Sequence, residues 1–170
     1  MNPAWEQEYV EYVTARLPVL RRLCCLLSGD EHRGDDLVQE AVTKLYVHWP
    51  RARGVEHLDA YVRAILVRTF LDDRRRGWAR VRLFSTPPEE PCVADSGAED
   101  RTVLRAALSR IPPRQQAVLV LRYLCDLSVA EVSEILGCSE GTVKSQSHHG
   151  LAALRARLGD RAGALARMEG

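Results

Sequence analysis

Apolar residues recur at helical spacing along most of the chain, and no segment shows the apolar–polar alternation that indicates a strand. A first helix is expected over residues 5–29, where apolar side chains fall near helical spacing at Tyr9, Val13, Leu17, Leu20, Leu23 and Leu27. Pro18 lies inside this pattern and predicts a kink or a break. A polar turn is expected over 29–34. Helices follow over 35–49 and from Leu58 to Arg76 or Val81, with a loop over 50–55 between them.

The second half of the chain is also predicted to be helical, and a different kind of segment separates it from the first half. Residues 83–100 contain three prolines, five acidic residues and no Lys or Arg, which predicts a flexible linker. Helices are expected over 100–110, ended by a Pro-Pro pair, over 115–124, and in two further segments as far as Leu158. We therefore predict an all-α fold of two small helical domains, over 1–82 and 101–170, with a tail from Gly159 that frays.

Residues 112–155 contain two capped helices joined by a tight turn. Ser128, with Glu131 three positions later, forms a predicted capping box. Gly137 permits the left-handed conformation that ends a helix, and Ser139 caps the next helix almost at once. Because so short a connection makes two helices cross steeply, the segment predicts a helix-turn-helix.

The second helix of this pair has two different faces. Val143, Leu151 and Leu154 are expected to be buried. The outward residues can form hydrogen bonds, and they are Glu140, Thr142, Lys144, Ser145, Gln146, His148 and His149. Such a face fits the major groove of DNA, where base edges present donors and acceptors. Two capped helices around a glycine also occur in ordinary helical bundles, so the pattern alone does not decide between the two.

Charge is segregated along the chain. The formal net charge is only +1, so the protein is not expected to attract nucleic acid by overall charge. A basic stretch from Arg74 to Arg82 ends a predicted helix, whereas the acidic run lies in the predicted linker. Solvated surface is the alternative for either run, but their placement favours a role in binding.

Metal, cofactor, membrane and catalytic functions find no support in the sequence. The five cysteines form no CxxC pair, so we expect free buried thiols and no zinc site at Cys24, Cys25, Cys92, Cys125 and Cys138. No apolar run is long enough to span a bilayer, and residues 1–7 lack the features of a signal peptide. We therefore expect a cytoplasmic protein that has no membrane partner, no cofactor, no metal and no enzymatic activity.

The segment IPPRQQAVLVLRYLCDLSVAEVSEILGCSEGTVKSQ resembles the promoter-recognising domain of bacterial sigma factors, and the similarity extends over about 101–158. Two-component transcription factors share a similar helix-turn-helix, so the N-terminal half decides between the two families. There, LSGD at 27–30 and DDLVQEA at 35–41 are similar to the polymerase-docking helix of sigma factors, and residues 60–76 to their −10-recognising helix. The order of these blocks is that of the small extracytoplasmic-function (ECF) branch.

The resemblance implies that the helix beginning at residue 35 docks on a coiled coil of the polymerase β′ subunit. The candidate polymerase-binding residues lie within two turns of this helix, and they are Asp35, Asp36, Gln39 and Glu40. One alternative is local, because acidic side chains interact favourably with a helix N-terminus. Another is an acid–base or metal site of an enzyme, but no pocket, nucleophile or His–carboxylate set is indicated.

A second set of candidates would act on the melted −10 element, where aromatic and arginine side chains stack on bases and neutralise phosphates. These candidates are Arg51, Arg53, Tyr61, Arg63, Arg68, Arg74, Arg75 and Arg76. Core packing is the alternative for Tyr61, and an ordinary surface charge for Arg63. Many ECF members carry Asn where this chain has Arg68, so the resemblance leaves the −10 preference of this chain open.

The sequence thus predicts an ECF-like sigma factor that binds the β′ and β subunits of core RNA polymerase and directs the enzyme to promoter DNA. Its recognition helix would contact the −35 element through the outward residues 140–149, and an anti-sigma factor is a further candidate partner. Ser147, His148 and His149 stand where an Arg-rich run is expected, so phosphate contacts there would be weaker or depend on histidine protonation. The alternative is a stand-alone helix-turn-helix regulator with a helical sensory domain, which would bind duplex DNA without polymerase.

Overall fold

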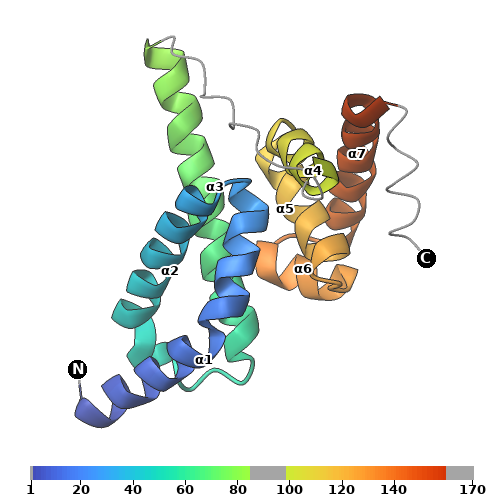
Figure 1. Cartoon of the computed structure of the whole chain (residues 1–170). Coiled ribbons are helices and arrows are strands. Elements are labelled where there is room, and N and C mark those ends of the chain that lie inside the picture. The colour runs from blue at the N-terminus through green and yellow to red at the C-terminus, as the bar shows by residue number, and fades with distance from the viewer. Residues whose placement is uncertain (1, 85–98, 160–170) are drawn as a thin grey trace. The chain divides into compact units, whose positions relative to one another are not determined.

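The computed structural model describes residues 2–84 and 99–159. The chain forms two compact units, Met1–Arg75 and Arg76–Gly170. Every element in the described residues is a helix, which confirms the predicted all-α fold (Figure 1). The linker predicted over 83–100 is too long at both ends, because one helix runs through Phe84 and the next begins at Glu99. Residues 85–98 and 160–170, which hold the rest of the predicted linker and most of the tail, lie outside the described part, so those predictions stay untested. None of the described helices is both long enough and apolar enough to cross a bilayer.

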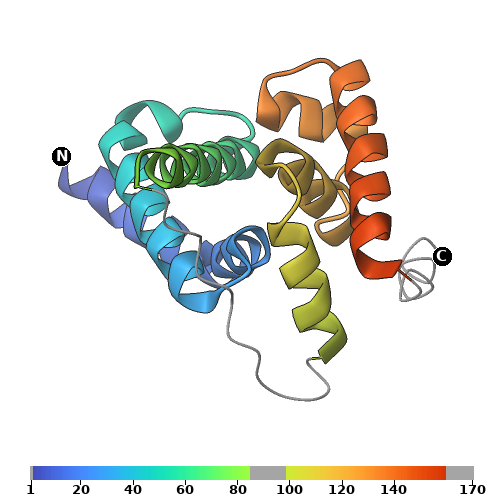
Figure 2. The ribbon, with the colours of Figure 1, turned by 90° about the horizontal axis from the view of Figure 1, so that it is seen from above.

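The N-terminal unit is built from α1 (Pro3–Ser28), α2 (Glu31–Ala52) and the first part of α3 (Leu58–Phe84). Figure 2 shows the three helices side by side. Gly29, at a φ of 73°, ends α1 in the left-handed conformation and lets α2 return along it. The apolar faces of these helices form a core whose buried side chains include Leu20, Leu23, Leu27, Leu37, Val38, Leu45, Val62, Leu66 and Phe70.

Helix α1 continues through Pro18, so the break that this residue could have caused is absent. A proline removes the hydrogen bond from its own nitrogen to the carbonyl four residues earlier, here that of Thr14. Thr14 is exposed, so its carbonyl can accept from water instead. Figure 1 shows the axis of α1 changing direction along its length, as predicted for a proline kink.

The polar turn predicted over 29–34 is wrong in extent, because α2 begins at Glu31. The carboxylate of Asp30 accepts from the backbone N–H of His32 at 3.1 Å and starts the helix there. Gly34 therefore lies inside α2 and is buried. The loop predicted over 50–55 is likewise too long, since α2 runs through Pro50 to Ala52.

The second unit contains α4 (Glu99–Ser109), α5 (Pro113–Leu119), the π-helical turn η1 (Val120–Leu124), α6 (Val129–Leu136) and α7 (Glu140–Leu158). Helix α7 packs against α4, α5 and α6. The buried apolar side chains of this unit include Leu108, Ile111, Val118, Leu121, Val132, Ile135, Val143 and Leu154.

The helix predicted over 115–124 is regular only as far as Leu119. In the π turn that follows, the N–H of Cys125 donates to the carbonyl of Val120, five residues earlier, at 2.9 Å. Asp126 then adopts a left-handed φ of 53°, and the N–H of Leu127 donates back to Leu121 at 3.0 Å. Apolar spacing did not reveal this turn, because it only reports that the segment is helical and buried.

Candidate nucleic-acid interface and docking helix

The helix-turn-helix has the capping geometry that the sequence predicts. The hydroxyl of Ser128 accepts from the N–H of Glu131 at 3.1 Å, and the Glu131 carboxylate accepts from the N–H of Ser128 at 2.7 Å. Gly137 ends α6 at a φ of 63°, and the hydroxyl of Ser139 accepts from the N–H of Thr142 at 3.1 Å. The start of α7 is therefore fixed by side-chain hydrogen bonds within a few residues of the turn.

Packing against α5 fixes the buried side of α7. Val143 and Leu154 are buried as predicted, whereas Leu151 is only half-buried. Gly150 takes the closest position instead, because a Cβ atom there would lie 3.2 Å from the side chain of Leu119 and 3.3 Å from the Cβ of Gln115. Sequence reasoning missed this glycine, although a glycine inside a helix was a usable signal of close approach.

The seven predicted −35 residues on α7 differ in solvent exposure. Glu140, Lys144, Ser145, His148 and His149 are exposed, whereas Thr142 and Gln146 are half-buried. The hydroxyl of Thr142 lies 2.9 Å from that of Ser139, so it takes part in the cap. The imidazoles of His148 and His149 meet edge to face, with ring centroids 5.7 Å apart. An exposed polar face at the N-terminal half of this helix is what base and phosphate contacts require.

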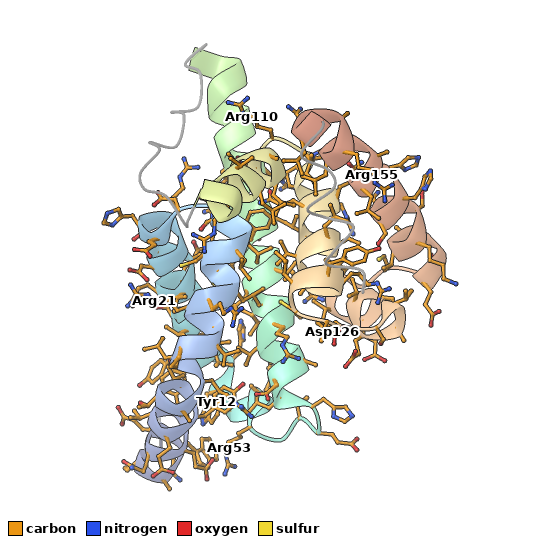
Figure 3. All side chains as sticks on the ribbon, turned by 45° about the vertical axis from the view of Figure 1, so that its right-hand side comes forward. Tyr12, Arg21, Arg53, Arg110, Asp126 and Arg155 are labelled. Atoms are coloured by element: carbon orange, nitrogen blue, oxygen red, sulfur yellow. The ribbon has the colours of Figure 1, made fainter. Side chains whose placement is uncertain are left out.

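Arg122 braces the segment that leads into the helix-turn-helix, and sequence reasoning missed it. Its Nη1 atom donates to the carbonyl of Leu127 at 2.6 Å, one residue before the Ser128 cap. Its guanidinium also lies 5.7 Å from the ring centroid of Tyr123. Figure 3 labels Asp126, which lies in the turn between Arg122 and Leu127. The arginine thereby satisfies a carbonyl that the irregular turn would otherwise leave without a local donor.

On α2, the four predicted polymerase-binding residues do not form one open cluster. Asp35 accepts two hydrogen bonds from Arg21 of α1, at 2.6 and 2.9 Å (Figure 3). Hydrogen bonding to Asp35 raises the pKa of the Arg21 guanidinium. Glu40 pairs with Lys44 at 2.8 Å. Asp36 and Gln39 are exposed. Of the four predicted docking residues, Asp36 and Gln39 are therefore the most open to solvent, with Glu40 beside them.

The carboxylates of α2 belong to no evident metal site. The described residues contain no group of three or more His, Cys, Asp or Glu side chains placed to hold a metal ion. The four cysteines within the described ranges form no disulfide with one another, as predicted. Only Cys24 is buried as expected, whereas Cys25, Cys125 and Cys138 are half-buried. Burial raises the pKa of the Cys24 thiol to about 12, with smaller contributions from Cys25 and Asp35.

Hydrogen bonds and aromatic contacts hold the end of α2 and the start of α3 against α1. Tyr9 donates to the carbonyl of Val42 at 2.8 Å, and its ring meets that of Trp49 at 5.4 Å. Tyr12 donates to Asp59 on α3 at 2.8 Å, and burial followed by this bond raises the Tyr12 pKa. Figure 3 labels Tyr12 and Arg53 in this region. The loop that carries the candidate −10 residue Arg53 is thus held at both ends.

Arg53 is itself held by α1. Its Nε and Nη2 atoms donate to the carboxylate of Glu8, both at 2.7 Å, and its guanidinium lies 5.1 Å from the ring centroid of Trp5. The bond to Arg53 lowers the pKa of Glu8. Arg51, by contrast, is exposed at the end of α2. Of the two arginines in this predicted DNA-binding segment, Arg51 is therefore the freer to meet a phosphate.

The remaining −10 candidates lie on two sides of α3. Tyr61, Arg68 and Arg75 are seven positions apart and share one face, on which both arginines are exposed. Arg63 and Arg74 lie on a different face and are half-buried. Burial, and then the charge of Arg33, lowers the pKa of Arg74. Arg76 is exposed near the Arg68 face. A single stretch of DNA along α3 would meet Arg68 and Arg75 before Arg63 or Arg74.

Comparison with known proteins places both halves of the chain in recognised families. Residues 12–80 match the sigma-70 region 2 family, and residues 101–154 match the sigma-70 region 4 family. The chain is 36% identical over 158 residues to the RNA polymerase sigma-E factor of Streptomyces coelicolor, covering 89% of this chain and 86% of the relative. It is 31% identical over 147 residues to the ECF RNA polymerase sigma factor SigL of Mycobacterium tuberculosis, covering 82% of each.

A solved structure shares the fold. The sigma factor RpoE from Bartonella quintana, solved in complex with the anti-sigma factor NepR, matches with a TM-score of 0.75. The match covers 89% of this chain and 97% of that one at 22% sequence identity. The likeness supports the arrangement of helices described above.

Proposed function

Because this chain belongs to the sigma-70 family of RNA polymerase sigma factors, in its ECF branch, we propose that it binds core RNA polymerase and directs the enzyme to a subset of promoters. The observation that carries the proposal is the capped helix-turn-helix with an exposed polar face on α7, within the region 4 match. In this role the chain acts by binding, and the chemistry of RNA synthesis belongs to the polymerase.

Helix α2 is the proposed docking element. Asp36 and Gln39 are exposed on it, and Glu40 lies one turn before its partner Lys44. These polar groups would contact the β′ subunit, with the β subunit as a further contact of the bound chain. Asp35 has the different role of holding α2 to α1 through Arg21. Because Asp35 holds α2 to α1, only Asp36, Gln39 and Glu40 would need to contact the polymerase.

The two DNA elements would be recognised by different helices. The exposed residues of α7 would lie in the major groove of the −35 element, with Ser139 and Thr142 fixing the start of the helix. The face of α3 with Tyr61, Arg68 and Arg75 would meet the melted −10 strand, where stacking and phosphate contacts supply affinity. The domain limits 1–82, 83–100 and 101–170 and a cytoplasmic location are parts of the same proposal. So is an anti-sigma partner, by analogy with the NepR complex of RpoE.

Co-purification with core polymerase tests the docking step. The full chain is expected to form a stable complex, and Asp36→Lys combined with Glu40→Lys is expected to abolish it. The matched control is Glu56→Lys, which reverses an exposed charge outside α2. Circular dichroism and tryptophan fluorescence should show the same folded unit in all three proteins. Undiminished polymerase binding by the double variant would remove α2 as the docking element. Promoter binding without any polymerase binding would favour a stand-alone regulator.

A further inference from the structure

We propose that His148 and His149 make α7 bind DNA more tightly as the pH falls through the range in which imidazole takes up a proton. The proposal rests on DNA binding by α7, as proposed above, and adds to it a means of regulation. Imidazole is the side chain whose charge ordinarily changes between pH 5 and 8, and two of them lie side by side on the recognition helix.

The position of the two histidines carries the proposal. Both are exposed, on the side of α7 opposite the buried Val143, Gly150 and Leu154. His148 lies one turn after Lys144, and His149 one turn after Ser145. Although successive residues of a helix point about 100° apart, the two ring centroids are only 5.7 Å apart, so the imidazoles form one pair on the outward side of α7.

A helix in the major groove has a phosphate backbone on each flank. The imidazole pair on the outward side of α7 would therefore lie in the negative potential of these phosphates. Lys144 and Arg155 are exposed on the same edge as His148, so its side of the helix already carries permanent positive charge. The edge that holds Ser145 and His149 has none between residues 140 and 149. A proton on the imidazole pair would add positive charge to an outward face on which Lys144 is the only permanent cation between residues 140 and 149.

Among the described side chains of this unit, none is paired with either imidazole in competition with DNA phosphate. The charged side chains described on the helices packed against α7 are Arg105 on α4, Arg114 on α5, and Glu131 and Glu134 on α6. Glu131 is held in the Ser128 cap. In the part of the chain that the structure describes, neither histidine forms an ion pair or a hydrogen bond with any of them.

The sign of the effect follows from linkage. Phosphate interacts more favourably with imidazolium than with imidazole, so the complex binds more protons than the separated protein and DNA. Affinity must then rise as pH falls. Each proton taken up neutralises a further phosphate and steepens the dependence of log affinity on log salt by about 0.9.

The test measures binding of the full chain to a labelled duplex of mixed sequence, because phosphate contacts do not depend on base sequence. Anisotropy at pH 6 and pH 8, over a range of salt, should give about three- to tenfold tighter binding at the lower pH. His148→Gln with His149→Gln should reduce this ratio to less than about twofold, and each single variant should give an intermediate ratio. His148→Lys with His149→Lys should bind tightly at both pH values.

Two controls separate this proposal from the one it rests on. His48→Gln, an exposed histidine on α2, should leave the pH ratio unchanged. Lys144→Gln should weaken binding at both pH values and keep the ratio, because lysine stays charged throughout. A full pH ratio in the double Gln variant, with Lys144→Gln still weakened, would overturn the histidine proposal and leave α7 as the DNA-binding helix. Unchanged affinity in all the α7 variants would overturn both proposals.

Discussion

A Cβ atom built on Gly34 of α2 would lie 2.7 Å from the Sγ atom of Cys25 on α1 and 3.0 Å from its backbone nitrogen. The two helices therefore meet at the backbone, at a position two residues before Asp36. Rotation of the Cys25 side chain would relieve only the first of these contacts. Only glycine fits here without moving α1 from α2, so this contact sets the position of the proposed docking helix.

Gly34→Ala is expected to destabilise the N-terminal unit. Inserting a methyl group into a packed contact costs about 1–3 kcal/mol, from which the helix preference of alanine recovers about 1 kcal/mol. Trp5 and Trp49 lie in this unit and Trp78 on α3, so urea unfolding followed by tryptophan fluorescence reports this half of the chain. Gly77→Ala is the control, because nothing lies within 4 Å of its Cβ position. Equal stability of the two variants would contradict the close approach of the helices.

The Glu8–Arg53 pair gives a stability difference that depends on pH. The hydrogen bond from Arg53 lowers the pKa of Glu8 below its ordinary value of 4.5. A carboxylate whose pKa is lower in the folded state stabilises that state above the unfolded value and loses the effect as pH falls through the folded value. Glu8→Gln should therefore unfold at lower urea than the parent chain at pH 7, and the two should converge as the pH falls below 4.5 and through the lower folded-state pKa. Glu56→Gln, in an exposed loop, should show no such convergence. A gap between Glu8→Gln and the parent chain that does not narrow as the pH falls would show that packing around Trp5, and not this charge, accounts for the loss.

Lys144 and Glu140 are expected to make different kinds of contact with the −35 element. Lys144 is assigned to a phosphate, so Lys144→Ala should weaken binding to all sequences alike and flatten the salt slope by about one unit. Glu140 is assigned to a base, because a carboxylate can accept from cytosine but is repelled by phosphate. Glu140→Ala should cost about 1–3 kcal/mol on the preferred sequence and relax specificity at one position. Transcription from a set of −35 variants distinguishes the two. Altered sequence preference in Lys144→Ala, with an unchanged salt slope, would reverse this assignment.

The parts of the site that the sequence predicted are those made by short-range interactions. The bonds of Ser128 with Glu131 and of Ser139 with Thr142 each join residues three positions apart, and Gly137 needs only its own backbone freedom. Residue type and spacing are sufficient to predict such features. The outward face of α7 follows from the same periodicity once its first residue is fixed.

The contacts that the sequence did not reveal join residues far apart in the chain. Arg53 and Glu8 are 45 positions apart, and Arg21 and Asp35 are 14 apart. Both pairs involve residues predicted to bind a partner, and charge alone could not show that they bind each other. The start of α2 was placed too late because Gly34 was interpreted as a turn residue, whereas it is buried inside the helix by contact with Cys25.

The central claim is that this chain confers promoter recognition on core RNA polymerase, and in vitro transcription from a genomic promoter library tests it most directly. Polymerase supplemented with the full chain should produce discrete transcripts whose promoters share two sequence elements. Core polymerase alone, or with the Asp36→Lys and Glu40→Lys double variant, should not produce them. Glu56→Lys should retain them. If the full chain binds specific duplex DNA but adds no transcript to those of core polymerase, the account of this protein as a sigma factor is contradicted.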